Sequence, residues 1–239
     1  MLEIYYEWGK LVKIKRIFTL IFLSAVLGIS FPGHSKNFIT SFFRSTGQQI
    51  RKLIWGHNFH TVDASILYRC RQLSDTEMEN YITKYDIKTV LNLRPEDEEP
   101  DAFQQEKQMC KKNNILFLNV PMNGQTITPE YDVKQLITIL EIAPRPIIVH
   151  CRAGADRTGE VCALYKLLNN SSTNEALSQL SVKYSHFSWI LPRKQELIKN
   201  IDTLYPKIIP SMKKACSLYN FAPQEASEFD PKEILRAIQ

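Results

Sequence analysis

The chain has 239 residues, is 44% hydrophobic and carries a formal net charge of +5, so it can form one α/β domain of ordinary size, and a disordered chain is not the expectation. The charge is uneven, because residues 1–59 contain eight Lys and Arg against two Asp and Glu, whereas the remainder contains twenty-two against twenty-three. A nearly neutral body excludes nucleic-acid binding as the main function.

The first 35 residues have the layout of a signal peptide or membrane anchor. Four basic residues precede the uncharged run IFTLIFLSAVLGISF, which covers residues 17–31. This run is shorter than the roughly 20 residues that span a bilayer as a helix, so cleavage after Ser30 or Ser35 is favoured over an anchor. Basic residues before the run predict export of the body, to the periplasmic side in a bacterium. A buried helix of a cytoplasmic protein is the alternative.

Residues 36–57 are expected to form an amphipathic linker helix. Their apolar residues recur at helical spacing, with Arg, Lys and Gln between them. Such a stripe either packs against the domain or lies on a membrane surface. Packing against the domain is the favoured interpretation.

Residues 58–218 are expected to form the main domain, and residues 219–239 a C-terminal tail. Strands are predicted over 65–69, 88–93, 115–120 and 146–150. Helices are predicted over 74–85 and 100–113, from Thr128 and Pro129 onward, and near 158–169, 173–185 and 193–205. This alternation predicts an α/β fold with a mostly parallel central sheet flanked by helices.

Two helix starts have recognisable capping residues. Ser74 and Glu77 have the spacing of a capping box, and Thr128 before Pro129 is expected to cap the next helix.

The five cysteines do not have the spacing of a zinc site. Cys162 is expected to face the core from a helix. A disulfide among Cys70, Cys110 and Cys216 is left open.

The stretch HCRAGADRTG, residues 150–159, connects the strand at 146–150 to the next helix. Ligands bind at the carboxyl ends of parallel strands, where this turn lies. Consecutive backbone N–H groups between Cys151 and Arg157, a helix start and the Arg157 guanidinium form an anion site there. Gly154 permits the backbone conformation that this turn needs. Because the same donors lower the pKa of a thiol, we expect Cys151 to be a nucleophile beneath a bound phosphoryl group.

The stretch resembles the signature of the cysteine-dependent protein tyrosine and dual-specificity phosphatase superfamily, which reads His-Cys, five residues, Arg and then Ser or Thr. Residues 59–96 are similar to the opening of the compact atypical dual-specificity group of bacteria, fungi and plants. The resemblance implies the cysteine-phosphatase fold. It also implies a two-step reaction in which Cys151 attacks phosphorus and water then releases the phosphate, without a cofactor or a metal.

The same resemblance assigns roles to the other residues of the loop. Arg157 and the loop amides would stabilise the charge that develops in both transition states. Thr158 would assist departure of the thiolate, and His150 would orient the loop. The residues between the cysteine and the acidic position would bind the phosphate: Arg152, Ala153, Gly154 and Ala155.

The general acid departs from the family pattern, because the segment VPMNGQTIT has no carboxylate where many relatives carry an aspartate. Asp156 is the first candidate, as in a bacterial group with Lys-Asp-Arg at this place. Ala155 replaces that lysine, which argues against a preference for multiply phosphorylated lipids. The second choices, more readily explained as a solvated acidic loop, are Asp97, Glu98 and Asp101.

Other polar residues are expected to be structural. Arg94 is expected to pair with the acids that follow it. The three histidines outside the loop are expected to be surface or structural residues: His57, His60 and His186.

The expected function is hydrolysis of a phosphomonoester, first of all on a phosphorylated protein by a tyrosine or dual-specificity phosphatase. A phosphoinositide or phospholipid headgroup is the alternative substrate, which the N-terminal segment favours because it could contact a membrane surface. A catalytically silent phosphate-binding module is the alternative of another class.

Overall fold

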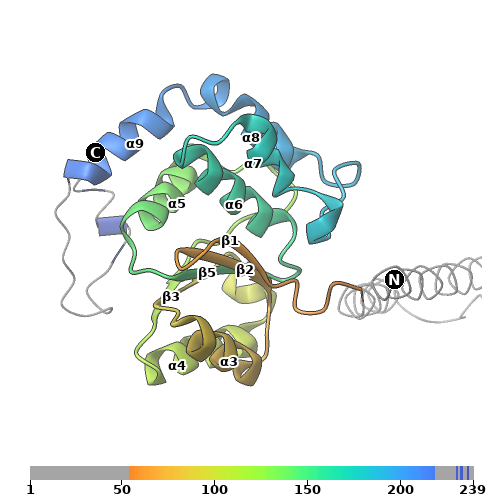
Figure 1. Ribbon diagram of the computed structural model, residues 1–239, viewed down its shortest axis with the longest axis vertical. Coiled ribbons are helices and arrows are strands. Elements are labelled where there is room, and N and C mark those ends of the chain that lie inside the picture. The colour runs from red at the N-terminus through yellow and green to blue at the C-terminus, as the bar shows by residue number, and fades with distance from the viewer. Residues whose placement is uncertain (1–53, 219–229, 231, 234–235, 237–239) are drawn as a thin grey trace, which may run out of the picture. The chain divides into compact units, whose positions relative to one another are not determined.

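The computed structural model describes residues 54–218, 230, 232–233 and 236 (Figure 1). The expected signal or anchor at 1–35, nearly all of the linker helix at 36–57 and most of the tail at 219–239 therefore lie outside the described residues. In the part that the structure describes, no helix is long and apolar enough to span a membrane. The account below concerns the compact unit that begins at Trp55.

The centre of this unit is a five-stranded sheet in the order β1-β2-β5-β3-β4. β1 pairs antiparallel with β2, and all the other neighbours pair in parallel. β5 lies between β2 and β3 and is buried along its whole length, as expected for a central strand covered on both faces. The strands are β1 (His60–Asp63), β2 (Leu67–Arg71), β3 (Thr89–Asn92), β4 (Leu116–Asn119) and β5 (Ile147–Cys151).

Helices cover both faces of the sheet (Figure 1). One face is covered by α3 (Asp75–Tyr85) and α4 (Pro100–Lys112), and the side chain of Ile148 in β5 packs among their apolar residues. The other face carries a larger core, into which Val149 and Cys151 of β5 point. The helices on this face are α5 (Glu130–Ile142), α6 (Asp156–Leu168), α7 (Thr173–Ser178), α8 (Arg193–Leu204) and α9 (Ile208–Leu218).

The predicted fold class is confirmed, and each predicted strand agrees with a strand of the structure to within two residues. The capping box at the start of α3 is also present, since the Ser74 side chain and Glu77 exchange hydrogen bonds with each other's backbone. β1 and α9 were not predicted. The helix predicted over 173–185 is shorter, because α7 is followed by the separate 3-10 helix η2 (Val182–Tyr184).

The prediction that Thr128 caps α5 is wrong. α5 begins at Glu130, its N-cap is Pro129, and no side chain caps it. The Thr128 hydroxyl lies instead 3.0 Å from both carboxylate oxygens of Glu160 and 3.1 Å from Lys194 Nζ. Two buried charged groups therefore take the hydroxyl that the helix end would otherwise use.

Candidate active site

The loop between β5 and α6 is one residue shorter at its start and two at its end than predicted. β5 continues through Cys151 instead of ending at His150, and α6 begins at Asp156 instead of near Thr158. The turn of the chain is therefore confined to residues 152–155, and the helix start lies closer to the cysteine than expected.

Gly154 has a φ of +66°, in the left-handed region that side chains disfavour. A Cβ atom at this position would lie 2.4 Å from the carbonyl oxygen of Cys70 in β2. Both the conformation and the close approach of β2 therefore require glycine.

The Cys151 thiol lies at the base of this loop and is buried. Burial alone would raise its pKa, but the Arg157 charge and the hydroxyl and backbone N–H of Thr158 hold the pKa below that of an ordinary thiol. Burial instead raises the pKa of Cys162 to about 11. The structure thus provides one thiol that favours the thiolate. All five cysteines are free, so none of them forms a disulfide.

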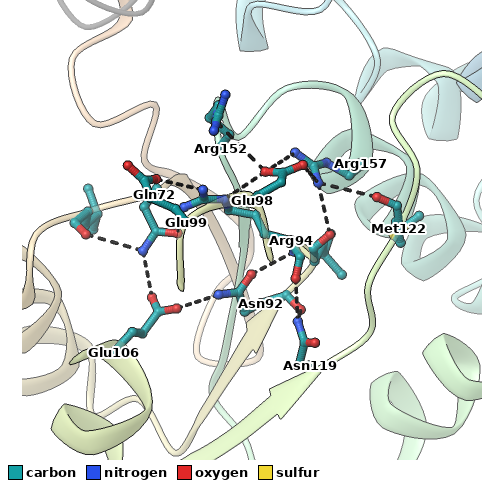
Figure 2. Close-up of polar contacts among 12 residues, drawn as sticks. Gln72, Asn92, Arg94, Glu98, Glu99, Glu106, Asn119, Met122, Arg152 and Arg157 are labelled. Carbon is teal, nitrogen blue, oxygen red and sulfur yellow. Dashed lines mark hydrogen bonds and ion pairs between the residues drawn. The ribbon is translucent and has the colours of Figure 1, made fainter. Parts of the chain in front are cut away.

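The Arg157 guanidinium is fixed at the carboxyl end of β3. Its Nη1 atom donates to the carbonyl oxygens of Leu93 and Met122, at 3.3 and 3.4 Å (Figure 2). Its two terminal nitrogens also contact the Glu98 carboxylate, at 2.9 and 3.4 Å. Such a planar fork binds two oxygens of one anion, and in this structure the anion is a carboxylate of the same chain.

Glu98 lies in the short 3-10 helix η1 (Glu96–Glu98) and bridges several arginines (Figure 2). Its Oε2 atom is 3.1 Å from Arg94 Nε and 3.9 Å from Arg152 Nε. Burial alone would raise the pKa of Glu98, but its hydrogen bonds to Arg157 and Arg94 hold the pKa below the ordinary value. In this arrangement both carboxylate oxygens of Glu98 face arginines, so Glu98 acts here as an anion on Arg157 and Arg94.

The other two candidate acids of this region lie on the surface. Asp97 and Asp101 are exposed. The expected ion pairing of Arg94 is present, with Glu98 and with Glu99 at 2.7 Å.

Asp156 begins α6, directly before Arg157, and its side chain is 18% exposed. The Asp156 Oδ1 atom lies 2.7 Å from Nδ1 of His186, whose side chain is fully buried. His186, which was expected to be a surface or structural residue, is buried and contacts the candidate acid. No signal in the sequence joins two residues 30 positions apart, so this contact needed the structure.

His150 points to the opposite face of the sheet from Cys151. Its Nε2 atom lies 3.0 Å from Glu106 of α4, and both side chains are buried. Burial alone would raise the pKa of Glu106, but the His150 charge and hydrogen bonds from Asn92 and Gln72 hold the pKa below the ordinary value. Glu106, which sequence reasoning missed, therefore anchors the strand residue that precedes the thiol.

Cys151, Asp156, Arg157 and Thr158 lie together at the end of β5 and the start of α6. Two of the histidines outside the loop make contacts with residues that are not part of it. His57 contacts Glu77 and a tyrosine, and His60 hydrogen-bonds Asn58.

A central parallel strand that ends in a low-pKa cysteine, a tight loop and an arginine at the next helix define the class of cysteine-dependent phosphatases. The family model described as "DSP-PTPase phosphatase fused to NAD+ Kinase" matches residues 55–196, and the chain belongs to this family. It is thus a cysteine-dependent phosphatase of the dual-specificity type.

Solved structures of phosphatases share this fold. TpbA from P. aeruginosa, in complex with pTyr, has a TM-score of 0.51 at 16% identity and covers 67% of this chain and 91% of its own. The core catalytic domain of the PP-IP phosphatase SIW14 from S. cerevisiae, in complex with citrate, has a TM-score of 0.53 at 22% identity and covers 66% of this chain and 93% of its own. A comparison with curated protein sequences gives no match.

Proposed function

We propose that the protein hydrolyses phosphomonoesters through a cysteinyl-phosphate on Cys151, with a phosphorylated protein as the first substrate class. The observation that carries this proposal is the Cys151 thiol, which is buried yet has a lowered pKa because Arg157 and Thr158 favour the thiolate. A buried thiol without such partners has a raised pKa, as Cys162 has.

The reaction has two steps. The Cys151 thiolate attacks phosphorus, the ester P–O bond breaks, and the leaving oxygen takes a proton from Asp156. Water then attacks the cysteinyl-phosphate and returns a proton to Asp156, while the S–P bond breaks to release phosphate and the thiolate. Arg157 and the loop N–H groups stabilise the added charge in both transition states. Thr158 stabilises the departing thiolate.

Arg157 must exchange one anion for another in this scheme. The Glu98 carboxylate occupies its fork at 2.9 and 3.4 Å. A bound phosphoryl group replaces Glu98 on Arg157, and Glu98 keeps its 3.1 Å contact with Arg94.

The choice of a protein substrate is supported by TpbA, a fold neighbour that was solved in complex with pTyr. A second candidate is a small molecule with several phosphate groups. It is favoured by the three arginines around the loop, Arg94, Arg152 and Arg157, and by the neighbouring PP-IP phosphatase SIW14. A phosphoinositide or phospholipid headgroup stays in the same group of candidates.

The test is metal-free hydrolysis of a substrate panel by the full chain. The panel contains para-nitrophenyl phosphate, phosphotyrosine and phosphothreonine peptides, a phosphoinositide and an inositol pyrophosphate. NADP+ is included in the panel because the matched family is described as a phosphatase fused to NAD+ kinase. Cys151→Ser should abolish turnover of every member, and the matched control Cys162→Ser should retain it. Binding without turnover by the wild-type protein would favour the silent phosphate-binding module.

The acid is tested by comparing leaving groups. Aryl phosphates have good leaving groups and need little protonation, whereas alkyl phosphates need an acid. Asp156→Asn should therefore lower kcat for an alkyl phosphate by about 100-fold or more, and for an aryl phosphate far less. Glu98→Gln is the comparison variant, since Glu98 is the other carboxylate near Arg157. Equal losses on both substrates in Asp156→Asn would contradict the assignment.

We also propose that the N-terminal segment exports the protein or attaches it to a membrane. The support is its sequence, with basic residues before an uncharged run. Cell fractionation with mass analysis of the mature chain tests this. Recovery of an unprocessed chain in the cytoplasmic fraction would contradict it.

A further inference from the structure

The outer side of the catalytic loop has its own set of hydrogen-bond donors. In a trans peptide the C=O and N–H groups point in opposite directions. A loop that turns its N–H groups toward a phosphate must therefore turn its carbonyl groups away from it. Those carbonyls need donors behind the loop, because buried backbone groups are almost always paired.

The structure provides such a donor for each carbonyl group between Cys151 and α6. The backbone N–H of Gln72 donates to Arg152 at 3.2 Å. The Asn58 side-chain amide donates to Ala153 at 2.9 Å and to Gly154 at 3.2 Å. The Arg69 guanidinium donates through Nη2 to Gly154 at 2.8 Å and to Ala155 at 3.4 Å.

Arg69 is an unusual donor, because it is a charged residue in the middle of β2 and is completely buried. Its Nη1 atom is held by the backbone and side-chain oxygens of Gln179, at 2.9 and 3.0 Å. Its guanidinium lies 4.0 Å from the centre of the Tyr184 ring. Among the described residues, no carboxylate oxygen lies within the 4.0 Å of an ion pair with Arg69.

A buried cation without a carboxylate is costly. Neutral partners such as carbonyl groups offset part of that cost, and a phosphate dianion on the other side of the same loop offsets more, since charges interact strongly in a low-dielectric interior. The position of Arg69 is therefore best explained by an anion bound in the loop.

Asn58 adds a link to a second part of the site. It has a φ of +46°, and the same amide that holds the loop also donates to the carbonyl of Tyr184 at 3.1 Å. Tyr184 lies two residues before His186, the residue that contacts Asp156. Asn58 thus connects the loop to the segment that holds the candidate acid.

We propose that Arg69 and Asn58 are positioning residues that hold the carbonyl groups of the catalytic loop outward, so that its N–H groups are ordered to bind phosphate and to favour the Cys151 thiolate. The inference rests on the proposed function of the loop. Neither residue touches the substrate, and each acts through the backbone of residues 153–155.

The experiment uses the full chain and compares Arg69→Met, Arg69→Lys and Asn58→Gly with the wild type. Glycine is chosen at 58 because it keeps the positive φ without strain. The first measurement is the dissociation constant of inorganic phosphate, read from its protection of Cys151 against iodoacetamide. The second is the pH dependence of that alkylation without phosphate, which gives the thiol pKa. The melting temperature is recorded for every variant.

Arg69→Met should weaken phosphate binding by about tenfold or more and raise the Cys151 pKa by about one unit, because each loop N–H contributes a charge-assisted hydrogen bond. Asn58→Gly should change both quantities in the same direction by a smaller amount. Arg69→Lys should restore part of the affinity, since it keeps the charge but not the two-nitrogen fork. The matched control is Arg145→Met, because Arg145 also donates to a backbone carbonyl, that of Leu140 at 2.7 Å, outside the loop.

Folded variants with wild-type phosphate affinity and thiol pKa would overturn the proposal, and so would equal changes in Arg145→Met. A merely structural role would lower the melting temperature and leave both quantities unchanged in the folded protein. If Arg69→Met does not fold, Arg69→Lys and Asn58→Gly still decide the question. If the wild-type thiol itself has an ordinary pKa and phosphate does not protect it, the proposed function fails instead.

Discussion

The buried pair of Lys194 and Glu160 gives a quantitative test of how α6 is held behind the catalytic loop. Lys194 Nζ lies 2.7 Å from Glu160 Oε2, and both side chains are fully buried. The Thr128 hydroxyl bonds to both residues. Burial raises the pKa of Glu160 to about 7, although Lys194 and Thr128 oppose this shift.

The perturbation is Lys194→Met. Above pH 7 it leaves Glu160 buried without its cation, and Glu160 then takes up a proton, which costs up to about 1.4 kcal/mol of unfolding free energy for each pH unit above the wild-type pKa of about 7. Near pH 5 Glu160 is protonated in the folded protein, so the loss of Lys194 should cost less than about 1 kcal/mol. The destabilisation caused by this one variant should therefore depend on pH.

The sign of the wild-type pH dependence follows from the same shift. The folded pKa of Glu160, about 7, lies above the ordinary glutamate value of 4.5. This group therefore favours the folded state most at a pH below 4.5, and that contribution falls as the pH rises toward 7. The fall amounts to about 3 kcal/mol, because each pKa unit corresponds to about 1.4 kcal/mol.

The assay is urea denaturation at pH 5 and pH 8 for the wild type, Lys194→Met and the double variant Lys194→Met/Glu160→Gln. The double variant keeps an acceptor for Thr128 and removes both charges, so it should recover most of the stability at pH 8. A penalty for Lys194→Met that is equal at the two pH values would refute this reasoning. A double variant as unstable at pH 8 as the single variant would refute it as well.

Three further predictions concern the surroundings of the thiol. The pKa of Glu106 is lowered in the fold, so its contribution to stability is complete above pH 4.5 and is lost as the pH falls through the folded pKa. Glu106→Gln should therefore flatten the fall in melting temperature between pH 6 and pH 3. A melting temperature that falls as steeply in the variant as in the wild type would exclude this role. Gly154→Ala should lower kcat/KM by about 100-fold or more, because its Cβ would lie 2.4 Å from a backbone carbonyl oxygen and displace the loop. Kinetics close to those of the wild type would contradict the claim that β2 lies too near the loop for any side chain at this position. Iodoacetamide near pH 7 should alkylate Cys151 before Cys162, whose pKa is raised to about 11. Mass spectrometry of the labelled peptides gives the order of alkylation. Earlier labelling of Cys162 would contradict the pKa reasoning.

Much of the fold follows from local patterns in the sequence. β5 could be predicted because IIV is a branched apolar run between proline and the glycine-containing loop, and α3 because Ser74 and Glu77 form a capping box. β1 was missed because its four residues are not consistently buried and so show no clear alternation. α9 was missed because its sequence, IIPSMKKACSL, contains a proline near its start.

The candidate site was predictable only where its residues are close in the chain. Cys151, Asp156 and Arg157 lie in one short segment, so their spacing shows that they meet. Arg69 and Asn58 approach the same loop from 85 and 95 residues away, and no local pattern records such distances. Thr128 shows the opposite failure, because a local capping rule gave way to contacts with two buried charges that lie far along the chain.

The chemistry-bearing residues lie together on one continuous strand, turn and helix start, whereas η1 and the segment that carries the exposed Trp189 and Ile190 are separate pieces of chain. Nucleophile, arginine and candidate acid thus lie within seven consecutive positions, and the rest of the chain contributes contacts to their side chains, such as Glu98 on Arg157 and His186 on Asp156. Of these two segments, η1 is the one whose residue Glu98 contacts Arg157, so its exchange would change the surroundings of the bound anion while the sequence HCRAGADRTG is left intact.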